Sequence, residues 1–156
     1  FLPHLKKAGD GHIINTSSLF GLLSLPTQGT YNASKFAMRG FTESLRQELD
    51  LENCGVSATC VHPGGIRTNI ARDAKMDNSI AAKTGGSAQA AKDKFDKLLN
   101  TTTAESAALQ ILKAVEGNKR RVVVGPDAKF LDLFVRVLGS WYQPVTAFFA
   151  KKTMLG

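Results

Sequence analysis

The sequence predicts an α/β fold, namely half of a doubly wound parallel sheet. Two short apolar runs, residues 12–16 and 56–61, have the composition of buried strands, and about twenty residues with helical spacing, 30–51, lie between them. A strand, a helix and a strand in this order are typical of a right-handed crossover between parallel strands. The 43% hydrophobic content is enough for a packed core. We therefore expect both strands to end at the same edge of the sheet, where ligands bind in folds of this class.

The helix predicted over residues 30–51 is amphipathic. Its apolar residues recur every four positions and are expected to share one face: Ala37, Phe41, Leu45 and Leu49. Gly9 and Gly11 separate an opening helical turn from the first strand, and Gly55 ends the long helix. We expect the second strand to stop at Pro63-Gly64-Gly65, because proline cannot donate to a sheet ladder.

The second half of the chain adds a third strand and further helices. Residues 69–101 are polar and small with one weak helical pattern, and we expect a mobile substrate-binding lid over residues 69–103. Thr102 and Glu105 form a predicted capping box for a helix that ends at Gly117. Residues 122–124 are expected to form a third parallel strand.

The carboxyl-terminal stretch carries aromatic and aliphatic residues at helical spacing, broken by Gly139 and Pro144. Three interpretations are open: a cover for the core, a surface for an oligomer or a substrate pocket, or a helix at a membrane interface. We favour core or oligomer, because Lys151 and Lys152 are the only basic flank and Pro144 interrupts the apolar pattern.

The net charge of +7 does not by itself predict a nucleic-acid partner. Lysines and aspartates alternate through residues 73–97, and only Lys119-Arg120-Arg121 forms a compact basic cluster. The sequence has no uninterrupted apolar run of membrane-spanning length. We therefore expect a cytoplasmic protein that binds neither nucleic acid nor membranes.

The cysteines and histidines do not have the spacing of a metal site. Cys54 and Cys60 lack the CxxC pattern and are expected to be reduced thiols. His4, His12 and His62 are isolated, so packing or surface roles are expected for them. We predict no metal.

Tyr31 and Lys35 lie one helical turn apart near the start of the long helix, so the phenol and the ammonium share one side. A nearby cation and the positive end of the helix dipole both favour the phenolate form of Tyr31. The side chain could then both accept a proton as phenolate and donate one as phenol. Ser18, after the first strand, is positioned to hold a substrate oxygen. The pair alone is a weak motif, because a structural tyrosine and a surface lysine would have the same spacing. The prediction is stronger because the start of this helix is expected at the same edge of the sheet as two strand ends, one followed by Ser18 and the other by Pro63-Gly64.

Three segments together resemble the short-chain dehydrogenase/reductase family in residue type and spacing. They are Gly11-His12-Ile13-Ile14-Asn15-Thr16-Ser17-Ser18-x-x-Gly21, Tyr31-Asn32-Ala33-Ser34-Lys35 and Pro63-Gly64-Gly65-Ile66-Arg67-Thr68. The resemblance implies a Rossmann-like NAD(P)-binding fold. It also implies an oxidoreductase that interconverts an alcohol and a ketone or aldehyde by hydride transfer with NAD or NADP.

The resemblance further implies roles for individual residues. Ser18 would orient the substrate, with Ser17 as its competitor, Tyr31 would be the general acid/base, and Lys35 would support Tyr31 and bind the nicotinamide ribose. The Ile66 backbone would contact the carboxamide, and Thr68 would lie beside it or the phosphates. The implied cofactor-binding residues are Tyr31, Lys35, Pro63, Gly64, Ile66 and Thr68.

Two family features are missing from the sequence. No glycine-rich phosphate-binding fingerprint occurs, and no upstream residue is present to select NAD or NADP. We therefore expect residues 1–156 to be the carboxyl-terminal part of one Rossmann-like domain whose amino-terminal dinucleotide-binding half is absent. The family's catalytic asparagine would also precede Phe1, so the fragment alone is expected to be inactive.

Two alternatives to a dehydrogenase remain open. The first is a catalytically silent binding or oligomerisation module, because the helix that carries Tyr31 resembles the one that commonly pairs subunits in the family. The second is an epimerase or dehydratase of the wider superfamily. Under all three interpretations we expect the full-length protein to be a homodimer or homotetramer. For the enzyme, the expected substrate is a small alcohol or carbonyl compound of modest hydrophobicity.

Overall fold

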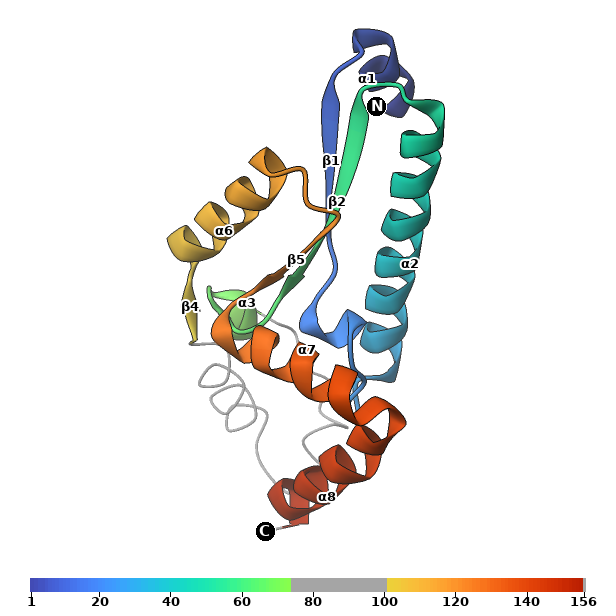
Figure 1. Ribbon diagram of the computed structural model, residues 1–156. Coiled ribbons are helices and arrows are strands. Elements are labelled where there is room, and N and C mark those ends of the chain that lie inside the picture. Colours follow the sequence, from blue (N-terminus) through green and yellow to red (C-terminus); the bar gives the residue numbers. More distant parts are fainter. Residues whose placement is uncertain (74–100, 156) are drawn as a thin grey trace.

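A parallel three-stranded sheet with the order β1-β2-β5 forms the centre of the molecule (Figure 1). The computed structural model describes residues 1–73 and 101–155. The strands are β1 (Gly11–Thr16), β2 (Val56–Pro63) and β5 (Arg121–Val124), with Thr16 beside Val61 and Pro63 beside Val124. The predicted α/β class with parallel strands is therefore confirmed.

Helices cover both faces of this sheet (Figure 1). Helix α2 (Gly29–Glu52) packs on one face in a cluster with Val56 and Ala58 of β2, and helix α6 (Ala104–Glu116) packs on the other with Val61. The faces differ because successive side chains of a strand point to opposite sides. Helix α1 (Leu2–Ala8) precedes β1. This arrangement of helices is that of a doubly wound sheet.

The predicted apolar stripe of α2 is only half correct. Leu45 and Leu49 are buried against the sheet, but Ala37 is exposed and Phe41 is 62% exposed. Each four-residue step advances about 40° around a helix of 3.6 residues per turn, so the stripe turns away from the sheet. The buried face instead carries Asn32, Thr42, Leu45, Arg46 and Leu49.

Strand β2 stops where predicted, at the Pro63-Gly64-Gly65 segment. Pro63 is the last residue of β2 and pairs with Val124. Cys60 and Gly64 donate their N–H groups to carbonyls on the β5 side. Because successive N–H groups of a strand point to alternate sides, the Pro63 nitrogen faces β1. Because β1 has already ended at Thr16, the missing N–H of Pro63 costs no ladder bond.

A second, two-stranded parallel sheet joins β3 (Ile66–Arg67) to β4 (Thr102–Thr103). Since Thr102 belongs to this sheet, the α6 cap lies one residue later than predicted: the Thr103 hydroxyl accepts from the Ser106 N–H at 3.2 Å. Helix α3 (Ile70–Asp73) follows β3. Most of the predicted lid over residues 69–103, with its weak helix, lies outside the described residues.

The carboxyl-terminal stretch folds as α7 (Pro126–Leu138), a 3₁₀ turn η2 (Gly139–Trp141) and α8 (Tyr142–Leu155). Gly139 ends α7 with a φ of 55°, as expected for a helix stop. Pro144 does not break α8, contrary to the prediction, because it lies in the first turn where backbone N–H groups have no helical partner. None of the helices in the described ranges has the length and apolar content needed to cross a membrane.

Candidate functional site

Ser17 and Ser18 leave the carboxyl end of β1 together but make different contacts. Ser17 is buried, its N–H donates to the Val61 carbonyl at 2.8 Å, and its hydroxyl donates to the Lys35 carbonyl at 2.8 Å. These bonds tie the end of β1 to β2 and to α2. A side chain on Gly21 would clash here, because its Cβ would lie 2.2 Å from the Ser17 hydroxyl.

Ser18 begins the short 3₁₀ turn η1 (Leu19–Gly21), and its hydroxyl accepts from the Phe20 N–H at 3.1 Å. It is half-buried, whereas Ser17 is 2% exposed. A hydroxyl that caps a turn through its oxygen still has its hydrogen available to donate. Of the two serines, Ser18 is therefore the one with a donor and an accessible position.

Tyr31 and Lys35 lie in the first two turns of α2, beside the end of β1. The Lys35 ammonium donates to the Thr16 carbonyl at 3.2 Å and lies 5.5 Å from the centroid of the Tyr31 ring. Tyr31 is 41% exposed, and the Phe20 ring meets its ring edge-on at 5.9 Å between centroids. The three residues predicted to be catalytic, Ser18, Tyr31 and Lys35, thus lie around the same strand end.

The segment from Pro63 to Thr68 starts at the neighbouring strand end. The Gly64 N–H donates to the Val124 carbonyl, and the Gly65 N–H donates to the Asp127 carboxylate at 2.7 Å. Ile66 pairs with Thr102 in the small sheet, and Thr68 is exposed. The predicted cofactor segment therefore leaves the same edge as Ser18, held by α7 and β4.

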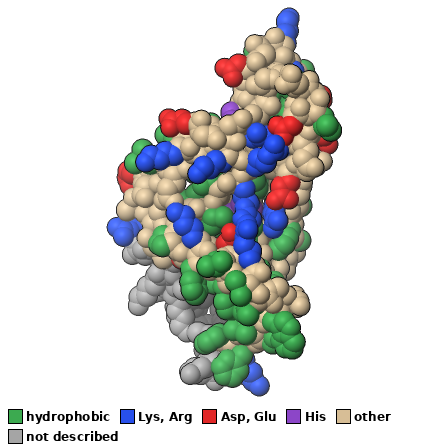
Figure 2. Space-filling view, viewed as in Figure 1, with side chains coloured by type: hydrophobic (Ala, Val, Ile, Leu, Met, Phe, Trp, Pro, Cys, Tyr) green, Lys and Arg blue, Asp and Glu red, His purple; other side chains and the backbone are tan. Residues whose placement is uncertain are grey.

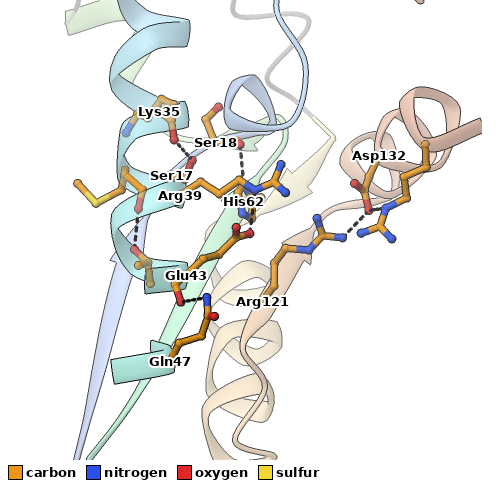
Figure 3. A network of polar contacts seen from close by, with 12 residues as sticks. Ser17, Ser18, Lys35, Arg39, Glu43, Gln47, His62, Arg121 and Asp132 are labelled. Carbon is orange, nitrogen blue, oxygen red and sulfur yellow. Dashed lines mark hydrogen bonds and ion pairs between the residues drawn. The ribbon is translucent and has the colours of Figure 1, made fainter. Parts of the chain in front are cut away.

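His62 lies beneath Ser18 in a polar network between α2 and α7 (Figure 3). Its Nδ1 is 2.9 Å from the Ser18 carbonyl oxygen, and the side chain is fully buried. Burial lowers the pKa of His62. The hydrogen bond to the Ser18 carbonyl acts in the opposite direction, and the positive charge of Arg39 on α2 lowers the pKa further. On the far side of this network Asp132 pairs with Arg121 and with Arg136, each at 3.1 Å.

The residues that hold this edge in place could not be recognised from the sequence. His62 was expected to have a packing or surface role, yet it is buried and bonds to the Ser18 carbonyl. Asp127 was not singled out, yet its carboxylate holds Gly65. Asp127 lies 62 positions from Gly65, so no local spacing could have indicated the contact. For His62, the signal was its place one residue before the Pro63-Gly64 turn.

The edge offers groups suited to a nucleotide cofactor. An ammonium has three donors, and among the described residues Lys35 uses one of them on Thr16, so the others can reach sugar hydroxyls. Exposed Thr68 adds a hydroxyl directly after β3, five residues beyond the end of β2. An exposed phenol beside an ammonium can exchange a proton with a bound oxygen. Groups of three or more potential metal ligands do not occur within the described ranges.

Comparison with known proteins identifies relatives along nearly the whole chain. The family model described as short chain dehydrogenase matches residues 1–79. SadH of Mycobacterium tuberculosis, which carries the name of an oxidoreductase, is 48% identical over 147 residues, covering 94% of this chain and 51% of SadH. Dehydrogenase/reductase SDR family member 7B of Danio rerio is 35% identical over 142 residues, covering 88% of this chain and 41% of that protein. The chain thus spans about half the length of the curated relatives it matches.

Solved structures share the fold. A short chain dehydrogenase/reductase from Burkholderia phymatum in complex with NAD superposes with a TM-score of 0.72 at 24% identity, covering 88% of this chain and 51% of that one. A short chain dehydrogenase from Burkholderia cenocepacia J2315 in complex with NADP gives a TM-score of 0.64 at 26% identity, covering 94% and 50%. The predicted Rossmann-like fold is therefore confirmed for this chain.

Proposed function

This chain belongs to the short-chain dehydrogenase family, and from that premise we propose that the full-length protein is an NAD(P)-dependent oxidoreductase. It would interconvert an alcohol and a ketone or aldehyde. The observation that carries the proposal is the convergence of Ser18, Tyr31 and Lys35 at one strand end, with the Lys35 ammonium 3.2 Å from the Thr16 carbonyl. Such a grouping supplies a hydroxyl donor, a proton carrier and a cation within one site.

Lys35 has two tasks in this proposal. Its ammonium stabilises negative charge on the Tyr31 oxygen by Coulomb attraction, and its remaining donors bind the ribose hydroxyls of the cofactor. The bond to the Thr16 carbonyl fixes the ammonium between the strand end and the Tyr31 ring. When bound, the nicotinamide would accept a hydride from the alcohol carbon or donate one to the carbonyl carbon.

Tyr31 moves the proton that balances the hydride. In the oxidation direction its phenolate takes the proton of the substrate hydroxyl, and in the reduction direction its phenol protonates the forming alkoxide. Ser18 donates a hydrogen bond to the same substrate oxygen and orients it. We assign this role to Ser18 because the hydroxyl of its competitor, Ser17, is committed to the Lys35 carbonyl.

The segment after β2 would bind the nicotinamide end of NAD or NADP. Pro63 and Gly64 turn the chain at the strand end, the Ile66 backbone would meet the carboxamide, and the exposed Thr68 hydroxyl would lie beside it or the phosphates. Two structural relatives with this fold are complexes with NAD and with NADP, which supports the class of cofactor but not a choice between them.

A homo-oligomer is the assembly we propose. Helix α2 turns large apolar side chains to solvent, with Phe36 38%, Met38 37% and Phe41 62% exposed. Exposed apolar side chains clustered on one helix favour a protein contact. The same observation favours the second candidate function, a catalytically silent module that uses α2 for assembly.

An absorbance assay at the nicotinamide band on the full-length protein tests the proposal, with NAD and NADP each offered against a panel of alcohols and carbonyls. Turnover with one cofactor supports the dehydrogenase. Cofactor binding without turnover across the panel favours the silent module. Conversion of the substrate without net change of the nicotinamide absorbance favours an epimerase or a dehydratase.

A further inference from the structure

Three consecutive peptide units at the end of β2 are each held by a different element. The Gly64 N–H donates to the Val124 carbonyl of β5 at 2.9 Å. The Gly65 N–H donates to the Asp127 carboxylate of α7 at 2.7 Å. The Gly65 carbonyl accepts from the Thr102 N–H of β4 at 3.0 Å. The path of the chain from β2 into the proposed nicotinamide segment is therefore fixed from three sides.

The last of these peptide units determines where the Ile66 N–H points. The Gly65–Ile66 peptide bond is trans, and the carbonyl and N–H of a trans peptide point in opposite directions. Since the Gly65 carbonyl faces Thr102, the Ile66 N–H faces away from β4. Ile66 is the residue whose backbone we expect at the nicotinamide carboxamide. The direction of this backbone thus depends on how Gly65 is held.

Asp127 supplies the one side chain among these three contacts, since the other two join backbone to backbone. The chain closes tightly around its carboxylate. A Cβ on Gly64 or on Gly125 would lie 2.6 Å from the Asp127 Oδ1 atom. Two glycines therefore make room for a carboxylate beside the segment that it holds.

Stability alone does not account for where this carboxylate lies. Asp127 is in the first turn of α7, where the helix dipole favours any negative charge. Lys and Arg side chains gather over α6 and the neighbouring sheet (Figure 2), and Asp132 of α7 pairs with Arg121 and Arg136. Asp127 makes no such ion pair within the described ranges and bonds to Gly65 instead. Its Oδ1 atom is buried without a donor from any described residue, which costs folding free energy.

We propose that Asp127 is a positioning residue for the nicotinamide end of the cofactor. Its carboxylate holds the Gly65 N–H and so directs the Ile66 backbone towards the carboxamide, without touching the cofactor itself. The inference rests on the proposed function, because it takes the segment from Pro63 to Thr68 to bind NAD or NADP. Without the acceptor the segment can move, and we expect the affinity for the dinucleotide to fall about 10-fold, as for the loss of a hydrogen bond to a charged group.

Calorimetric titration of the full-length protein tests this inference without turnover. The two probes are the preferred dinucleotide, NAD or NADP, and the matching ADP-ribose compound, which lacks only the nicotinamide. Asp127→Ala should bind the dinucleotide about 10-fold more weakly and the ADP-ribose compound almost as well as the wild type. Asp127→Asn, whose amide oxygen can accept from the Gly65 N–H, should recover most of the lost affinity.

Asp127→Glu separates the position of the carboxylate from its charge. It keeps a negative charge at the start of α7, but the extra methylene has no room beside Gly64 and Gly125. We therefore expect it to bind the dinucleotide as weakly as Asp127→Ala, also if the alanine variant fails to fold. In steady-state assays KM for the cofactor should rise in both variants, with KM for the alcohol close to that of the wild type.

Asp50→Ala is the matched control. The Asp50 carboxylate also accepts hydrogen bonds, from Arg46 and Arg120, but lies near the end of α2 that is opposite to Tyr31. Its loss should lower the melting temperature and leave the affinity for both probes unchanged.

Two results would overturn the inference: equal weakening of both probes in Asp127→Ala and Asp127→Glu, which would mean a general loss of structure, or wild-type affinity for the dinucleotide in both. If the variants behave as expected but no alcohol or carbonyl compound turns over, the inference stands and the dehydrogenase proposal fails. A wild-type protein that binds neither probe would refute the proposed function and this inference together.

Discussion

The Nδ1 atom of His62 lies 2.9 Å from the carbonyl oxygen of Ser18. A carbonyl oxygen only accepts, so Nδ1 must carry the hydrogen of a neutral ring, and Nε2 is then an acceptor. Burial favours this neutral form and lowers the pKa of His62. A buried side chain of β2 thereby fixes the backbone of the residue that we propose as the substrate anchor (Figure 3).

Replacing His62 should affect catalysis through the position of Ser18. In His62→Leu the Ser18 carbonyl loses its donor, and we expect kcat/KM to fall about 10-fold, equivalent to about 1.4 kcal/mol. His62→Asn, whose amide can donate from a position near Nδ1, should recover most of that loss. Steady-state kinetics of the two variants separate a positioning role from a packing role, since equal losses in both would indicate packing alone.

The stability of the protein should fall as the pH drops below about 6.5. Burial, with Arg46 near His12 and Arg39 near His62, lowers the pKa of both histidines in the folded state. An unfolded histidine titrates near 6.5, so the unfolded chain takes up protons first and is favoured as the pH falls towards the folded pKa values. Thermal melts between about pH 7.5 and 5.5 measure this slope.

His62→Asn is the control for that slope, because it removes one of the two histidines and leaves other titrating groups in place. A shallower decline of the melting temperature in the variant is expected. A decline as steep as that of the wild type would assign the pH dependence to other groups.

Ser17 and Ser18 should differ in their effect on activity. Ser18→Ala is expected to lower kcat/KM about 100-fold, as loss of a donor to a reacting oxygen does, and to cost about 1 kcal/mol of stability, because the Ser18 hydroxyl also caps η1. Ser17→Ala removes the bond to the Lys35 carbonyl and should cost about 1 kcal/mol of stability. Kinetics and denaturant unfolding of both variants check the assignment, and the reverse pattern would make Ser17 the anchor.

Two glycine substitutions should act in opposite directions. Gly21→Ala would bring a Cβ to 2.2 Å from the Ser17 hydroxyl and 2.8 Å from the Lys35 carbonyl, and such overpacking costs about 1–3 kcal/mol. Gly40→Ala on α2 meets nothing within 4 Å and should stabilise the helix by about 1 kcal/mol. Chemical denaturation measures both, and a stable Gly21→Ala would show that the η1 turn can move.

Sequence reasoning predicted the strands and helices of the crossover because their signals are local. The long helix, both strand ends and the Tyr31–Lys35 spacing follow from periodicity and from glycine or proline punctuation. The stripe through Ala37 and Phe41 was wrong because a four-residue spacing drifts around a helix, and polar Asn32, Thr42 and Arg46 took the buried face instead.

The remaining differences come from contacts between distant segments. Thr102 was a plausible cap by spacing, but pairing with Ile66 across the β3–β4 sheet moved the cap to Thr103. The bond of His62 to Ser18 joins residues 44 positions apart, and α8 lies near the loop at Leu25. No pattern within a short window of sequence encodes such contacts, because they depend on how whole elements pack.

The measurement that tests the central claim most directly is the rate of Tyr31→Phe in the full-length protein, followed at the nicotinamide band, with cofactor binding titrated in parallel. Phenylalanine keeps the ring that packs on Phe20 and removes only the hydroxyl. We expect the variant still to bind cofactor through Lys35 and the Pro63–Thr68 segment, while kcat falls by a factor of about 100 to 10,000, the usual contribution of a general acid/base. A variant that binds cofactor and keeps the wild-type rate would contradict the role of Tyr31.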